Sequence, residues 1–157
     1  MTPQPDQTAS DATTIEVETD AEAAACFALM HQLRPHLASA AEFVAGWRAQ
    51  RADGYRLLAR MQSGRPVALA GFRIQRNLVH GRHLYVDDLV TDAPARRAGH
   101  GEALMRDLVA AGRAAGCGKL VLDTPLANSL GQRFYFRQGL LATALRFTMP
   151  LAPPEPP

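Results

Sequence analysis

The segment ARRAGHGEAL, from Ala95 to Leu104, combines two arginines, two glycines and a histidine at the predicted start of a helix. Helices usually begin with a Ser, Thr, Asp or Asn side chain that caps the first turn, and none stands here. The unpaired N–H groups of a first turn and the positive end of the helix dipole attract anions. Glycines let a large anion approach the backbone, and arginines add charge. The pattern predicts a phosphate-binding site.

The spacing of this segment is Arg-x-x-Gly-x-Gly, formed by Arg96, Gly99 and Gly101. A Walker loop would end in Gly-Lys-Ser/Thr, which is missing, and the third glycine of a dinucleotide fingerprint is replaced by Leu104. A tight loop with solvated arginines is the alternative interpretation, because the hexad also arises by chance.

A second candidate is the pair Asp87–Asp88 in HLYVDDLVT (residues 83–91). The alternation of apolar and polar residues breaks at this pair, which predicts a β-bulge, and bulges often re-aim side chains beside active sites. Two adjacent carboxylates can raise each other's pKa, as a general base at neutral pH requires. The alternative is that both side chains bond to local backbone N–H groups.

The elements that must position these residues follow from apolar periodicity. Ser39 and Glu42 have the spacing of a helix N-cap with its capping box. Helices are expected at 20–33, 40–51, 101–115 and 128–138. Strands are expected at 14–17, 55–61, 67–74, 83–91, 119–124 and 140–149. Three of these strands follow one another and are expected to run antiparallel, which predicts a mixed α/β domain.

The composition sets limits on the class of protein. The chain has 157 residues, 47% hydrophobic and 20% charged, which suits one globular domain. We expect a loose tail at 1–13, a single domain at 14–151 and a Pro-rich tail at 152–157. No run approaches the roughly 18 apolar residues of a membrane span, and no signal peptide is apparent, so a cytoplasmic location is expected. Cys26 and Cys117 are interpreted as small buried hydrophobes.

Two segments together resemble a known family. DDLVTDAPARRAGHGEALMRDLVAAGRAAGC resembles the signature segment of the GNAT superfamily of N-acetyltransferases, and NSLGQRFYFRQGL resembles its later helix. The spacings from Asn128 to Tyr135 and from Tyr135 to Gly139 both match the family pattern. The resemblance covers residues 55–149 and is strongest to small bacterial members described as histone-acetyltransferase-like.

The resemblance implies a mostly antiparallel central sheet with two splayed strands and flanking helices. Acetyl-CoA would lie between strands 83–91 and 119–124, where the backbone of Leu89, Val90 and Thr91 would pair with its pantetheine arm. Asn128 and Arg133 match positions near the cofactor. The pyrophosphate would be held by the cradle residues Arg96, Arg97, Ala98, Gly99, His100, Gly101 and Glu102.

The implied reaction is direct transfer of an acetyl group to a primary amine in a ternary complex, without a metal. An amine with a pKa near 10.4 must lose a proton before it attacks. Asp87 or Asp88 would accept that proton, and Tyr135 would protonate the leaving thiolate. The residues Arg34, His36 and Tyr85 are expected acceptor contacts, and Arg34 would favour an acceptor with a carboxylate. Helix-end solvation is the alternative for Arg34 and His36.

The sequence also bears on other classes of function. A non-catalytic acyl-CoA-binding or regulatory module of the same fold is the main alternative. No nucleic-acid or membrane partner is expected, because the net charge is +2 and Arg73, Arg76 and Arg82 are better interpreted as a solvated sheet edge. A single final strand would leave an open sheet edge, which a second copy could cover in a homodimer.

Overall fold

The computed structural model describes residues 11–154, and these form two compact units. The first unit extends to Leu122, and the second unit begins at Asp123. The first unit contains β1 (Thr13–Glu16), α1 (Asp20–Leu33), α2 (Ala40–Ala52), β2 (Arg56–Gln62), β3 (Arg65–Asn77), β4 (Gly81–Thr91), a 3₁₀ turn (Ala93–Ala95), α3 (His100–Ala114) and β5 (Lys119–Leu122). The second unit contains α4 (Ser129–Arg137).

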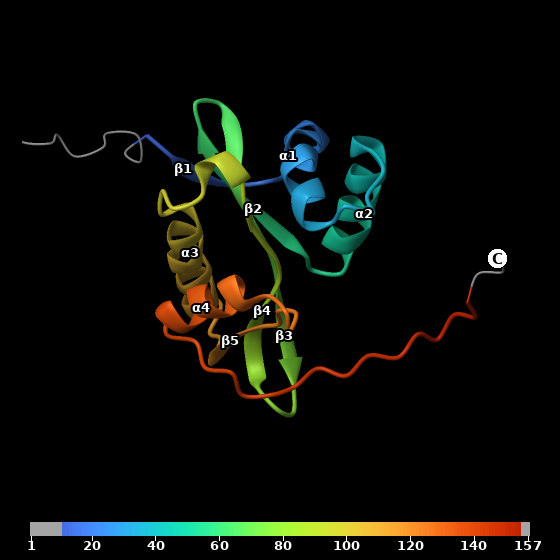
Figure 1. The fold of residues 1–157 in the computed structure, drawn as a ribbon, viewed down its shortest axis with the longest axis vertical. Coiled ribbons are helices and arrows are strands. Elements are labelled where there is room, and N and C mark those ends of the chain that lie inside the picture. Colours follow the sequence, from blue (N-terminus) through green and yellow to red (C-terminus); the bar gives the residue numbers. More distant parts are fainter. Residues whose placement is uncertain (1–10, 155–157) are drawn as a thin grey trace, which may run out of the picture. The chain divides into compact units, whose positions relative to one another are not determined.

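The five strands form one sheet in the order β1-β2-β3-β4-β5. All neighbours are antiparallel except β4 and β5, which are parallel. The predicted mixed, mostly antiparallel sheet with flanking helices is therefore confirmed. Figure 1 shows α1 and α2 together on one side of these strands and α3 on the other.

Local sequence explains where the elements begin and turn. Ser39 caps α2 by accepting a hydrogen bond from the Glu42 N–H at 3.1 Å, as its spacing predicts, but the capping box is incomplete because Glu42 accepts from the Ala38 N–H instead of the Ser39 N–H. Ser63 and Gly64 both have positive φ and join β2 to β3 in a tight hairpin. Because side chains alternate across a sheet, each face of β3 contributes to a different core. Leu69 packs with Trp47 and other residues of α1 and α2, whereas Leu84 of β4 lies under α3, near Gly112.

The predicted strand at 140–149 is wrong. These residues have no strand assignment and are mostly exposed. A strand needs a neighbour that supplies hydrogen bonds, and α4 is the only helix or strand among the described residues of the second unit. Apolar residues on alternate positions of this segment are exposed, namely Leu141, Leu145, Phe147, Met149 and Leu151.

The structure also bears on the predictions for the chain ends and the two cysteines. Residues 1–10 and 155–157, parts of the two predicted tails, lie outside the described residues, and Thr13 already belongs to β1. The single domain at 14–151 stays a prediction. Cys26 and Cys117 are both free; Cys26 is buried as predicted, whereas Cys117 is only partly buried. Burial raises the pKa of Cys26 to about 12, so its thiol is inert. Within residues 11–154 no helix is long and apolar enough to span a membrane.

Candidate active site

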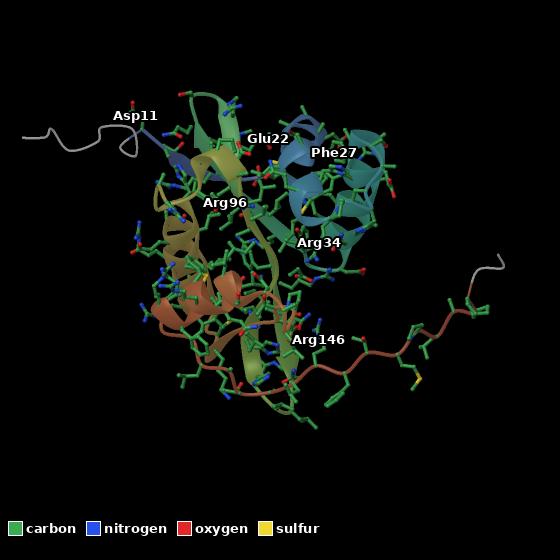
Figure 2. The ribbon with its side chains drawn as sticks, viewed as in Figure 1. Asp11, Glu22, Phe27, Arg34, Arg96 and Arg146 are labelled. Carbon is green, nitrogen blue, oxygen red and sulfur yellow. The ribbon has the colours of Figure 1, made fainter. Side chains whose placement is uncertain are left out.

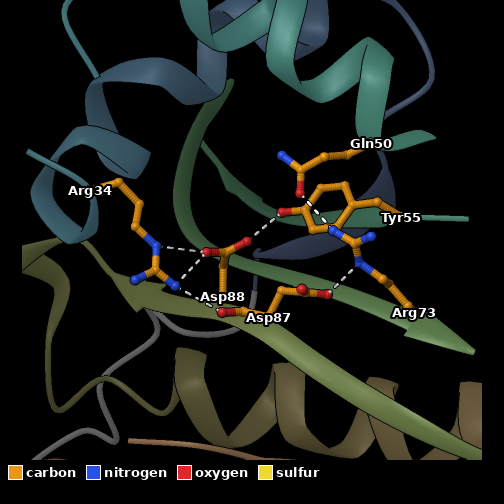
Figure 3. Close-up of polar contacts among 6 residues, drawn as sticks. All are labelled: Arg34, Gln50, Tyr55, Arg73, Asp87 and Asp88. Carbon is orange, nitrogen blue, oxygen red and sulfur yellow. Dashed lines mark hydrogen bonds and ion pairs between the residues drawn. The ribbon is translucent and has the colours of Figure 1, made fainter. Parts of the chain in front are cut away.

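The predicted bulge lies at Asp87. Gly71 of β3 pairs with Asp88 and Phe72 pairs with Val86, so Asp87 is the extra residue of β4. A bulge leaves its extra residue out of the ladder and bends the strand. This bend brings the carboxylates of both aspartates into one polar network (Figure 3).

The ladder between β4 and β5 ends next to this bulge. The parallel ladder runs from the pair His83–Lys119 to the pair Val86–Leu122 and stops there. Strand β4 continues to Thr91, paired with β3 alone among the described strands. The stretch Leu89–Thr91 therefore has one backbone edge turned away from β3 without a ladder partner in the described part of the chain. This end of the ladder agrees with the two splayed strands that the resemblance implies, and the splay itself stays a prediction.

The start of α3 has the features of an anion-binding turn. Gly99 is its N-cap, with a left-handed φ of 80°, and contributes no side-chain cap. The first intrahelical bond runs from the Ala103 N–H to the Gly99 carbonyl at 3.0 Å, so earlier N–H groups have no helical acceptor. Arg97 also has a positive φ, of 69°. The cradle loop, residues 96–99, is exposed, and a Cβ on Gly99 would meet no heavy atom within 4 Å.

Not every predicted cradle side chain points outward. His100 is 2% exposed, and burial followed by the charge of Arg60 lowers its pKa. Its imidazole is held inside the first unit, so this residue can offer a ligand its backbone N–H only. Arg96 reaches back to the Thr91 carbonyl at 3.4 Å, and Glu102 forms an exposed i,i+4 pair with Arg106. Figure 2 shows Arg96 in the segment that leads into α3.

The two aspartates have different partners (Figure 3). Asp88 accepts hydrogen bonds from Arg34 Nε at 2.9 Å and from Tyr55 Oη at 2.7 Å, and Arg34 Nη2 lies 2.8 Å from the same carboxylate. Asp87 accepts from Arg73 Nε at 3.1 Å, and its carbonyl accepts from Arg34 Nη2 at 2.9 Å. Asp88 is therefore held from two sides, whereas among the described residues only the Arg73 side chain donates to the Asp87 carboxylate.

The electrostatics also distinguish Asp87. Burial raises the pKa of Asp87 above its ordinary value, and Asp88 adds to this effect. Arg73 and Arg34 oppose the rise without cancelling it. A carboxylate with a raised pKa is a better proton acceptor near neutral pH than an ordinary aspartate.

The three predicted acceptor contacts have different surroundings. Arg34 caps the end of α1, and its guanidinium is already engaged by Asp88 and by the Asp87 carbonyl. A free carboxylate on an acceptor would have to compete with Asp88 for it. His36 is exposed in the connection between α1 and α2. Tyr85 lies on β4 opposite Arg73 of β3 and is partly buried.

The remaining predicted site residues belong to the second unit. Asn128 caps α4, accepting from the Gly131 N–H at 3.0 Å and donating to Thr124 Oγ1 at 3.0 Å. Tyr135 packs edge-on against Phe134, and burial raises its pKa above the ordinary value. Its hydroxyl therefore stays protonated at neutral pH, as a proton donor must. Arg133 is exposed on the same helix.

Tyr55 and Gln50 of the network were missed in the sequence, and so was Gly71 beside the phenol. The interpretation of Arg73 as part of a solvated sheet edge is wrong, because its side chain is 22% exposed and pairs with Asp87. Tyr55 is 3% exposed, and Gln50 accepts from Arg73 Nη2 at 2.8 Å. A Cβ on Gly71 would lie 1.9 Å from Tyr55 Oη. The available signal was Gly71 itself, because an isolated glycine inside a strand marks a bulge or a close approach.

A sequence model described as the acetyltransferase (GNAT) family matches residues 17–140, which include the bulge, the cradle and α4. The chain belongs to this family. The likeness to GNAT proteins inferred from the two motifs is thus confirmed, while the histone-acetyltransferase-like subtype stays a prediction.

Two curated relatives of this GNAT chain match it over part of their length. Glucosamine 6-phosphate N-acetyltransferase of Trypanosoma brucei brucei is 36% identical over 83 residues, covering 48% of this chain and 56% of the relative. The uncharacterized N-acetyltransferase YhdJ of Bacillus subtilis (strain 168) is 34% identical over 83 residues, covering 53% and 58%. The chain thus spans a little over half the length of these relatives.

Solved structures agree on the GNAT fold. A Trypanosoma brucei acetyltransferase is 25% identical with a TM-score of 0.76, covering 90% of this chain and all of the other. The aminoglycoside N-acetyltransferase AAC(6')-Iy, in complex with CoA, is 18% identical with a TM-score of 0.78, covering 90% and 95%. Ribosomal-protein-alanine N-acetyltransferase of Brucella melitensis is 18% identical with a TM-score of 0.77, covering 90% and 99%. The acceptors in these names differ, so the fold does not define one acceptor.

Proposed function

We propose that this chain is an acetyl-CoA-dependent N-acetyltransferase that acetylates a primary amine directly in a ternary complex. The observation that carries the proposal is the end of the β4–β5 ladder at Val86, immediately before the bulged residue Asp87. One loop later α3 begins without a side-chain cap. A free strand edge and a phosphate-binding turn in succession suit a long ligand with an amide-rich arm and a pyrophosphate. The CoA complex of AAC(6')-Iy supports this choice of ligand.

The chain's own groups would divide the binding of this ligand. The backbone of Leu89, Val90 and Thr91 would pair with the arm, and the N–H groups of the cradle from Arg97 to Glu102 would bind the pyrophosphate. Ala98, within the cradle, offers backbone alone, while Arg96 supplies charge beside it. Asn128 and Arg133 of the second unit are proposed as further contacts. When bound, acetyl-CoA supplies the thioester whose acetyl group is transferred.

The proposed proton transfers use residues already described. Asp87 accepts a proton from the ammonium form of the acceptor, directly or through water, which frees the nitrogen lone pair for attack on the acetyl carbonyl carbon. The new C–N bond forms as the C–S bond breaks. Tyr135 then gives its hydroxyl proton to the departing sulfur, and the second proton that the acetylated nitrogen loses restores the Tyr135 hydroxyl, while Asp87 releases its proton to solvent. Backbone N–H groups of the free β4 edge would stabilise the negative charge that develops on the acetyl oxygen.

The acceptor, location and assembly are proposed at a coarser level. The acceptor is a small-molecule or protein amine, as the varied names of the relatives suggest. The free thiols Cys26 and Cys117 suit a reducing compartment, which supports a cytoplasmic location. The exposed apolar residues of 141–151 support a homodimer.

The experiment that tests the proposed function is acetyl-CoA consumption, read as released thiol, across amines, polyamines, amino acids and lysine peptides. Turnover on one class supports the enzyme and identifies its acceptor. Binding of CoA in calorimetry without turnover on any amine would favour the non-catalytic module. Absence of both would contradict the cradle as well as the enzyme.

A further inference from the structure

Tyr55 lies at the centre of the network that contains both aspartates (Figure 3). Its hydroxyl donates to Asp88 Oδ2 at 2.7 Å. Its ring lies beneath the Arg73 guanidinium, whose central carbon is 5.5 Å from the ring centroid. Since Arg73 in turn donates to Asp87, one side chain touches Asp88 directly and supports the partner of Asp87.

The position of Tyr55 is itself strongly determined. Its N–H donates to the Gln50 carbonyl at 2.9 Å, which fixes the turn between α2 and β2. Its ring passes over Gly71, where any side chain would overlap the phenol. Gly71 is also the residue paired with Asp88 across the β3–β4 ladder, so the phenol reaches the carboxylate at the bulge itself.

The phenol is suited to donate and not to ionise. Burial, and after it the charge of Asp88, raises the pKa of Tyr55 well above its ordinary value. The hydroxyl therefore keeps its proton and remains a permanent donor to the carboxylate. Hydrogen bonds to a charged acceptor in a buried setting are among the stronger ones, so this contact resists rotation of Asp88.

We propose that Tyr55 is a positioning residue for the acidic pair, fixing Asp88 through its hydroxyl and the Arg73–Asp87 ion pair through its ring. This inference rests on the proposed function, because it assigns Tyr55 a part in arranging the proton acceptor of that reaction. Tyr55 needs no contact with the amine or with the thioester. Its effect reaches the chemistry through the orientation of Asp87 on a bulge that Asp88 holds in place.

The test measures three variants, namely Tyr55→Phe, Asp88→Asn and the double variant that combines them. Thr14→Val serves as the control. Thr14 Oγ1 donates to Asp107 Oδ2 at 2.7 Å, so the control removes a hydroxyl–carboxylate bond of the same length outside the network. We expect Tyr55→Phe to lower kcat by roughly tenfold to a hundredfold, as misplacement of a reacting group does, with little change in the KM for acetyl-CoA. Thr14→Val should shift the melting temperature comparably and keep kcat within about twofold.

The double variant separates positioning from an independent role. If Tyr55 acts through Asp88, the double variant loses no more kcat than Asp88→Asn alone, within about twofold, because interacting residues are not additive. Tyr55→Leu, which also removes the ring beneath Arg73, should lose more than Tyr55→Phe. A kcat for Tyr55→Phe equal to that of the control, or losses that multiply in the double variant, would overturn the proposal.

A second readout does not need turnover. A buried, hydrogen-bonded phenol proton exchanges slowly and gives its own proton NMR signal, which should vanish in Tyr55→Phe and shift in Asp88→Asn. A missing signal, or one that does not shift in Asp88→Asn, would overturn the proposed hydrogen bond from Tyr55 to Asp88. If the wild type acetylated no amine while this signal behaved as expected, the proposed function would fail. The hydrogen bond by which Tyr55 positions Asp88 would still be supported.

Discussion

Asp87 and Asp88 are neighbours in the chain, yet the residues around them separate their chemistry. Asp88 is enclosed by a guanidinium and a phenol, while Asp87 has one weaker ion pair and a pKa raised by burial. Two like groups with unlike surroundings commonly divide into a structural and a reactive member. This division makes Asp87 the better proposed proton acceptor and gives its partner Arg73 a measurable role.

Replacement of Arg73 by Gln is expected to move the acid limb of the activity profile to higher pH. The charge and hydrogen bond of Arg73 both lower the pKa of Asp87 against the effect of burial, so their removal raises that pKa further. Asp87 must be ionised to accept a proton, and more alkaline conditions are then needed. The measurement is log kcat/KM against pH, with Arg73→Lys as the partial rescue; an unmoved limb would rule out Asp87 as the titrating base.

Asp87→Asn should lower kcat by about 10²–10⁴-fold and yet raise the melting temperature at pH 7. Because the folded-state pKa of Asp87 lies above its unfolded value, ionisation costs stability as pH rises through this interval, and the cost persists above it. Asn stands permanently in place of the protonated acid. Thermal melts at pH 7 and at pH 3, where the gain should vanish, check the sign; a variant less stable than wild type at pH 7 would contradict it.

At the scale of the element, β3 and β4 accommodate the phenol only because residue 71 lacks a side chain. Gly71→Ala must displace Tyr55, since the new Cβ would lie 1.9 Å from its hydroxyl oxygen. We expect a loss of about 1–3 kcal/mol in the free energy of unfolding, typical of overpacking. Gly46→Ala is the control, because a Cβ added there in α2 would meet no heavy atom within 4 Å apart from the helix's own nearby backbone. Denaturant unfolding measures both; equal stabilities would argue against close packing of Tyr55.

The start of α3 depends on the left-handed backbone of Gly99. Gly99→Val should cost about 1–2 kcal/mol of stability and weaken CoA binding by more than tenfold, because a β-branched residue disfavours φ of 80°. Gly54→Val, at φ of 87° after α2, carries the same strain away from the cradle. Calorimetry with CoA should separate the two. Equal CoA affinity in both variants would mean that the cradle loop binds no phosphate.

At the scale of the whole molecule, the exposed apolar residues of the second unit are expected to mediate self-association. Leu145 and Phe147 have exposed fractions of 66% and 89%, and large exposed apolar groups at alternate positions usually mark an interface. The variant Leu145→Asp/Phe147→Asp should shift sedimentation from dimer toward monomer. Leu78→Asp, at the fully exposed tip of the β3–β4 hairpin, is the control. A wild-type chain that is monomeric at all concentrations would refute the expectation.

Much of the fold and part of the site could be predicted from the sequence. The features that were predicted depend on neighbouring residues, whereas those that were missed depend on contacts between distant ones. The bulge at Asp87 and the cap at Ser39 are local signals written in neighbouring residues. Alternation at 140–149 also looks local, but a strand forms only where a partner is available, so this prediction failed. Tyr55 was missed because its contacts are 16 and 33 residues away in the chain, at Gly71 and Asp88. Periodicity carries no information on such distances.

The end of the β4–β5 ladder at Val86 has a consequence for amide hydrogen exchange. One strand should contain two classes of N–H group, because the amides shared with β3 or β5 are protected while those facing the open edge exchange with solvent. A bound arm that pairs with Leu89–Thr91 would convert the fast class into the slow one. Exchange measured residue by residue would then trace the outline of the bound ligand along a single strand.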